Sequence, residues 1–157
     1  MLLPFFEWCE TLWLGRVVVG SLWLFPVIEA VHLLGLSVLG GSILIVDLRL
    51  LGLGLKHRSV SELARQARPW MIGALLVMIA TGIPLFLSEA IKCYYNTSFW
   101  VKMTTLAIAM VFAFTVRSRV TMSESVRNTA RRQALVGALS IALWVTVAAA
   151  GRWIGFS

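Results

Sequence analysis

Four long apolar stretches run through the chain, separated by short segments in which the charged residues gather. A helix that crosses a bilayer needs about 20 mostly apolar residues. Four stretches come near this length, at about residues 22–46, 70–88, 99–116 and 134–150. We therefore expect residues 1–157 to form a single all-α domain, an integral membrane four-helix bundle.

A shorter pattern precedes the first span. Its apolar residues recur at nearly helical spacing, with Glu7, Glu10 and Thr11 between them. These apolar positions are Phe5, Phe6, Cys9, Leu12 and Trp13. The pattern predicts a short N-terminal amphipathic helix that lies in the outer membrane interface.

The composition excludes an ordinary soluble domain. Of the 157 residues, 59% are hydrophobic and 13% are charged, against about one quarter charged in a typical soluble domain. A chain of this size cannot bury so much apolar surface in its own core. The lipid bilayer is the expected partner. The net charge of +7 is explained by the basic residues that membrane proteins carry in their cytoplasmic loops, so binding of nucleic acid is not expected.

The basic residues predict an orientation. Ten lie between the first and second or the third and fourth spans, and four lie on the other side. Because basic residues favour the cytoplasm, both termini are expected in the periplasm, with the chain in a bacterial inner (plasma) membrane. The ten are Arg49, Lys56, Arg58, Arg65, Arg68, Arg117, Arg119, Arg127, Arg131 and Arg132, and the four are Arg16, Lys92, Lys102 and Arg152.

Each cytoplasmic segment is expected to contain a short helix. Ser59 with Glu62, and Thr121 with Glu124, fit the capping box that starts a helix. The arginines that follow are either solvated topology signals or a docking surface for an anionic lipid or a partner.

Glu29 and His32 are ionisable residues inside the first span, three residues apart and therefore on one helix face. Their depth is open. Counted back from Asp47 they lie in the outer third of the bilayer, whereas a run centred on residues 17–46 places them near the middle. Ionisable groups are costly in a bilayer, so both are candidate functional residues.

Three more charged residues are expected near the outer ends of the other spans, in one layer with Glu29 and His32. They are Glu89, Lys102 and Arg152. An ion pair of Lys102 with Glu29 or Glu89 is the expected pairing. The layer lines a site or a pathway, or it only holds the helix ends together.

Asp47 and Arg49 form an Asp-x-Arg sequence at the cytoplasmic end of the first span. The pattern predicts an interfacial stop and a local ion-pair site. A cytoplasmic gate is a further reading that the sequence does not favour.

Glu29 and His32 also suggest a cofactor. Glu-x-x-His is half of a di-iron carboxylate motif, so both are candidate metal ligands, although the chain lacks the other half. Haem b is the second reading, with His32 as one axial ligand and Met103, Lys102 or the His32 of a second copy as the other. The identity of any cofactor stays open.

The two cysteines, Cys9 and Cys93, are both expected on the periplasmic side. An oxidising periplasm permits a disulfide between them, which would tie the interfacial helix to the segment between the second and third spans. Free thiols are the alternative, because the sequence supplies no distance between the two.

Five segments carry a resemblance to known proteins: LFPVIEAVHLLG at residues 24–35, VDLRLLG at 46–52, RPW at 68–70, SEA at 88–90 and KM at 102–103. Together they resemble an uncharacterised family of small bacterial inner-membrane proteins with four helices. The resemblance covers most of the chain and implies a shared pattern of Glu29, His32, Asp47, Arg49, Glu89 and Lys102, but no function. There is a fainter likeness to copper-resistance membrane proteins and b-type cytochrome bundles, in which further histidines are expected on other spans.

Three functions are open at this stage. The first is a cofactor- or ligand-binding membrane subunit, with haem-linked electron transfer as its most concrete form. The second is a small oligomeric channel or proton-coupled transporter in which Glu29 and His32 line the pathway. The third is a structural subunit of a larger membrane complex. The sequence contains no catalytic motif, so an enzyme is not expected. The chain is expected to form a homo-oligomer or to be a subunit of a membrane complex.

Overall fold

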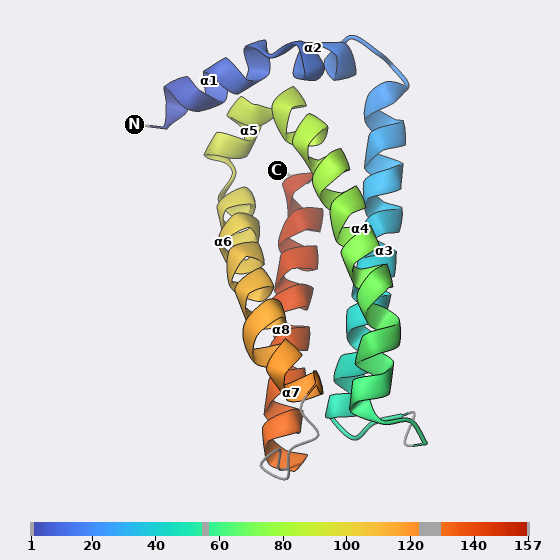
Figure 1. The fold of residues 1–157 in the computed structure, drawn as a ribbon. Coiled ribbons are helices and arrows are strands. Elements are labelled where there is room, and N and C mark those ends of the chain that lie inside the picture. Colours follow the sequence, from blue (N-terminus) through green and yellow to red (C-terminus); the bar gives the residue numbers. More distant parts are fainter. Residues whose placement is uncertain (1, 55–56, 123–129, 157) are drawn as a thin grey trace.

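The computed structural model describes residues 2–54, 57–122 and 130–156, and this part of the chain is all-helical. Four of its helices are long and apolar enough to cross a membrane: Leu24–Leu50, Val60–Ser88, Thr97–Met122 and Ala130–Ile154. They form an elongated bundle, and two short helices run across one end of it (Figure 1). The expected all-α membrane bundle with four spans is therefore confirmed.

The helices follow one another with short connections. In chain order they are α1 (Leu3–Thr11), α2 (Trp13–Val19), α3 (Leu24–Leu50), α4 (Val60–Ser88), α5 (Ala90–Tyr95), α6 (Thr97–Phe112), the π-helix η1 (Ala113–Arg117), α7 (Ser118–Met122) and α8 (Ala130–Ile154). The third span thus consists of α6, η1 and α7 in one continuous run. Both ends of the chain lie at the end of the bundle that α1 and α2 cross, here called the α1–α2 end (Figure 1).

The start of α3 fixes where Glu29 and His32 lie along the helix. Residues 20–23 are not helical, so the span begins at Leu24 and not near Val17. With 27 residues, α3 is about 40 Å long, which exceeds the bilayer core of about 30 Å. Glu29 lies in its second turn and His32 in its third. Both residues therefore lie in the first third of α3, counted from the α1–α2 end.

Ser59 caps the second span itself. Its side chain accepts a hydrogen bond from the backbone N–H of Glu62 at 3.1 Å, and α4 then runs without interruption to Ser88. The expectation of a separate short helix here was wrong, because the capped helix continues into the membrane. Of the second expected capping box, Thr121 lies in α7, and Glu124 lies outside the described residues.

The long helices pack through small residues, as expected where lipid removes the hydrophobic drive between helices. α3 packs against both α4 and α8, and α6 packs against α8. A Cβ atom on Gly137 of α8 would lie 2.9 Å from the carbonyl oxygen of Asp47, so the backbones of α3 and α8 touch there. A Cβ atom on Gly35 of α3 would lie 3.2 Å from Val77 of α4.

The N-terminal segment is two helices and not the single one expected. Leu12 has an extended conformation, with ψ of 141°, and it separates α1 from α2. α1 packs on α5 and α2 packs on α4. Two close approaches hold these helices on the bundle. The Glu10 carboxylate accepts a hydrogen bond from the backbone N–H of Ile91 at 2.8 Å. The backbone of Gly15 lies so close to α4 that a Cβ atom there would be 2.5 Å from the carbonyl oxygen of Leu87.

Candidate functional site

Three polar residues from three spans lie together toward the α1–α2 end of the bundle: His32, Thr81 and Lys102. They are called the outer polar cluster here, after the side that the sequence predicts for this end. The ring Nδ1 of His32 lies 2.8 Å from the hydroxyl oxygen of Thr81. That hydroxyl donates its own proton to the carbonyl oxygen of Val77 at 2.6 Å. Because the hydroxyl has one proton, it accepts from His32, and Nδ1 carries the hydrogen. In the neutral ring, Nε2 is then left with a free lone pair.

Two glycines make room for the cluster. A Cβ atom on Gly82 of α4 would lie 3.3 Å from Cε1 of His32. A Cβ atom on Gly151 of α8 would lie 3.4 Å from the Lys102 ammonium nitrogen. The imidazole therefore rests against α4 and the lysine side chain against α8, and His32 and Lys102 are close enough to interact electrostatically.

Lys102 is half-buried in the third span. No ion pair of its ammonium exists within the described ranges. The expected pairing with Glu29 or Glu89 is not formed, and Glu89 instead pairs with Lys92, at 3.7 Å. A cation in this position, with no carboxylate beside it, can accept an anionic group from a bound molecule.

The other candidate residues near the α1–α2 end lie on the surface. Glu29 is exposed, although His32 is half-buried one turn further along α3. Met103 is 45% exposed, and its predicted role as a second ligand stays a prediction. Arg152 is exposed and lies over the ring of Phe156, 4.6 Å from its centre.

A second polar group, the inner polar cluster, lies near the opposite end of the bundle and consists of Asp47, Arg117 and Ser140. Arg117 Nε donates to Asp47 Oδ1 at 2.7 Å, and Arg117 Nη2 donates to the carbonyl oxygen of Ile43 at 3.3 Å. Asp47 and Ser140 are completely buried, and Arg117 is 6% exposed. A buried charge pair of this kind joins α3 to the third span.

The partner of Asp47 differs from the sequence expectation. Asp47 and Arg49 do not pair, since Arg49 Nε donates to the carbonyl oxygen of Arg58 at 2.9 Å. Sequence reasoning counted Arg117 only as a topology signal. The signal that could have identified it is a buried aspartate in an apolar run, which requires a cationic partner from another span.

The inner polar cluster is incompletely satisfied. Asp47 Oδ2 and the hydroxyl of Ser140 are buried without a hydrogen bond, although Ser140 lies beside the Asp47 carboxyl group. The indole N–H of Trp144, one turn further along α8, is likewise buried and unpaired. Arg117 ends the π-helix η1, and π-helical turns frequently occur at functional sites.

Neither cysteine is bridged in the structure, and the predicted disulfide stays a prediction. Cys9 and Cys93 are both buried and free. Burial, and after it the charge of Glu89, raises the pKa of the Cys93 thiol to about 11. Burial also raises the pKa of Cys9.

The described residues do not assemble a metal centre from protein ligands alone. Within residues 2–54, 57–122 and 130–156, no group of three or more His, Cys, Asp or Glu side chains could hold a metal ion. Glu29 and His32 therefore lack the further ligands that a di-iron site requires.

The fold and the two polar clusters define a multi-pass, all-helical membrane protein with charged groups between its spans. The chain belongs to a family of unknown function, DUF6644, whose model matches residues 5–157. Comparisons with curated proteins and with solved structures found no match.

Proposed function

We propose that this chain is a ligand- or cofactor-binding subunit of a membrane, with its site at the outer polar cluster. The observation that carries the proposal is the half-buried Lys102 ammonium, which lies within a span with no carboxylate in ion-pair contact among the described residues. A charge in that position is costly unless something compensates it. A bound anionic group would do so.

The chemistry of the cluster defines the class of ligand. Lys102 offers a charged donor, and the Nε2 atom of neutral His32 offers a lone pair to a donor or a metal. The ligand therefore carries a carboxylate or phosphate for Lys102 and a hydrogen-bond donor or a metal for His32. Thr81 holds the imidazole in place, as an outer-shell partner does at many ligating histidines.

Haem b belongs to this class. Its iron would bind Nε2 of His32, and Lys102 would take a propionate. The second ligand would be Met103, the His32 of another copy or, where it does not take the propionate, Lys102. Electron transfer is the chemistry that such a haem supplies.

Proton-coupled transport is the second candidate, and one observation favours it. The outer and inner polar clusters lie in the same bundle, with His32 and Asp47 separated by fifteen positions on α3, about 22 Å. The unpaired indole of Trp144 lies on α8 beyond Ser140, among the apolar residues packed around Leu39 and Ile43. Ionisable groups at both ends of a bundle, with a polar group between them, are the kind of residues from which membrane proton relays are built.

Placement in the cell is part of the same proposal. The excess of arginine and lysine in the 3–4 and 1–2 connections supports a bacterial inner membrane with both termini in the periplasm. The outer polar cluster then faces the periplasmic leaflet. A second copy of the chain, or another membrane subunit, would complete such a site by supplying the second haem ligand.

Absorption spectra and native mass spectrometry of the detergent-purified protein test the function. A Soret band that sharpens with dithionite and disappears in His32→Ala would establish haem. A colourless protein that retains a mass adduct, lost in Lys102→Gln, would establish another anionic ligand. Lys92→Gln is the matched control, because this lysine is exposed and pairs with Glu89.

Two negative results separate the alternatives. If neither colour nor an adduct is found and proton flux in proteoliposomes falls in Asp47→Asn and His32→Ala, the transporter replaces the binding subunit. If flux is also absent, the chain is a structural subunit of a complex.

A further inference from the structure

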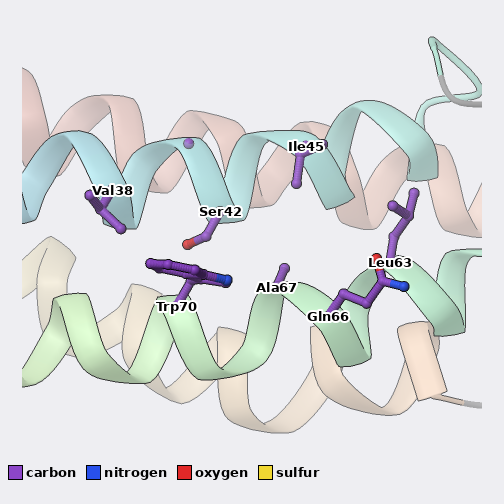
Figure 2. A pocket seen from close by; sticks show the side chains of 8 residues that line it. Val38, Ser42, Ile45, Leu63, Gln66, Ala67 and Trp70 are labelled. Atoms are coloured by element: carbon purple, nitrogen blue, oxygen red, sulfur yellow. The ribbon is translucent and has the colours of Figure 1, made fainter.

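A groove of about 400 Å³ lies on the outside of the bundle between α3 and α4, and no residue of either polar cluster lines it. α3 contributes Gly41, Ser42 and Ile45, and α4 contributes Gln66, Ala67 and Trp70. Figure 2 shows the Trp70 ring between the two helices, close to Ser42 and Val38. The groove is open to the outside of the bundle, and Trp70 is 68% exposed.

Small side chains create this groove. A Cβ atom on Gly41 would meet nothing within 4 Å, so the space above it is open. Ala67 lines the facing wall, and the other lining residues are mostly apolar. A helix has a diameter of about 10 Å and does not fit such a volume, whereas an extended alkyl chain does.

Arg49 provides a positive charge near one end of the groove. Arg49 lies four residues beyond Ile45 on α3, and therefore on the same helix face, one turn closer to the end of the bundle opposite α1 and α2. Its Nε donates to the carbonyl oxygen of Arg58. No carboxylate of the described residues pairs with Arg49, because Glu62 pairs with Arg58 and Asp47 with Arg117.

An apolar channel that ends at an arginine matches one kind of membrane molecule. We propose that the groove binds an anionic phospholipid, with one acyl chain between α3 and α4 and the phosphate at Arg49. Arginine recognises phosphate through several parallel N–H donors, and basic residues beside a span attract anionic headgroups. Gln66 and Ser42 add polar atoms along the wall.

Native mass spectrometry in mild detergent with equal amounts of phosphatidylglycerol and phosphatidylcholine tests this site. The wild type should retain phosphatidylglycerol preferentially. Gly41→Leu should reduce the retained lipid several-fold, because its side chain fills the groove. Gly40→Leu is the matched control, since a Cβ atom at Gly40 also meets nothing within 4 Å and Gly40 does not line the groove.

Arg49→Gln separates the headgroup from the chain. It should reduce the preference for phosphatidylglycerol about fivefold, the effect of one arginine near an anionic surface, while total lipid retention falls less. Ser42→Leu is a second groove-filling variant in case Gly41→Leu does not purify. Equal retention by the groove-filling variants and the Gly40→Leu control would overturn the proposal, and so would an unchanged preference in Arg49→Gln.

Discussion

Arg117 Nε lies 2.7 Å from Asp47 Oδ1, and this ion pair joins the π-helix of the third span to the first span. The two residues are seventy positions apart in the chain. Both are buried, so neither charge can turn to water. The pair fixes which face of the third span meets α3, and its loss leaves one charge uncompensated in the bundle.

Removal of one partner should therefore be far more damaging than removal of both. Asp47→Ala should lower the free energy of unfolding by about 3–5 kcal/mol, because it leaves Arg117 buried and unpaired. The double variant Asp47→Leu/Arg117→Met should recover much of that loss. Thermal unfolding in detergent measures both effects.

An exposed ion pair supplies the control. Glu62→Gln breaks the Arg58–Glu62 pair, which is partly exposed on both sides, and should cost less than about 1 kcal/mol. A loss in Asp47→Ala as small as in this control would show that the buried pair does not hold the spans together.

Much of the fold could be predicted because its main signal is one-dimensional. Twenty or so apolar residues require a bilayer and a helix, and four such runs give four spans. The break at Leu12 could not be predicted in this way. The apolar residues keep their helical spacing through this position, so the hydrophobic pattern shows no interruption where the helix ends. The continuous α4 was missed because a capping box marks where a helix begins and not how far it continues.

Close packing at Gly15 should make the α1–α2 end sensitive to a single methyl group. Gly15→Ala should destabilise the docking of α2 by about 1–3 kcal/mol, because the new Cβ would lie 2.5 Å from a backbone oxygen of Leu87. Limited proteolysis near residue 20 should then become faster. Gly73→Ala, where a Cβ atom meets nothing within 4 Å, should leave the cleavage rate unchanged.

The candidate site was predictable only in part. His32 and Lys102 were identified because ionisable residues are rare in spans. Their partners Thr81, Gly82 and Gly151 were not, since threonine and glycine are ordinary residues in membrane helices. Which of several charged residues meet is set by helix rotation, and apolar runs without a clear polar face do not reveal rotation.

The hydrogen bond between His32 and Thr81 predicts the tautomer of the imidazole. The chain has two histidines, so His57→Gln leaves His32 as the single one. Nitrogen-15 spectra of the neutral ring should show a protonated Nδ1 and an unprotonated Nε2. Thr81→Val should abolish this preference, whereas a protonated Nε2 in the parent would contradict the arrangement.

Topology is tested by reporters at the C-terminus. If both termini are periplasmic, alkaline phosphatase fused after residue 157 should be active in a bacterial host. Green fluorescent protein fused at the same position should not fluoresce, because it does not fold after export to the periplasm. A fusion in the connection near residue 56 should give the opposite result. The reverse pattern would place the outer polar cluster on the cytoplasmic side.

Cys93 should react slowly with thiol reagents, with a steep dependence on pH. Because its pKa is raised to about 11, chiefly by burial, only about one thiol in a thousand is ionised at pH 8. In a reduced Cys9→Ala variant, labelling should therefore accelerate about tenfold per pH unit until about pH 11. As an exposed reference, Lys92→Cys with both native cysteines changed to alanine should show a labelling rate that levels off near pH 9.

The same raised pKa predicts how stability depends on pH. The Cys93 thiol loses its proton at lower pH in the unfolded chain than in the folded one, so stability should fall as pH rises from about 9 to about 11. Fast labelling of Cys93 in the Cys9→Ala variant at pH 7 would show that the thiol is not buried. In the wild type, labelling of Cys93 that requires reduction, when the Cys9→Ala variant needs none, would establish the predicted disulfide with Cys9.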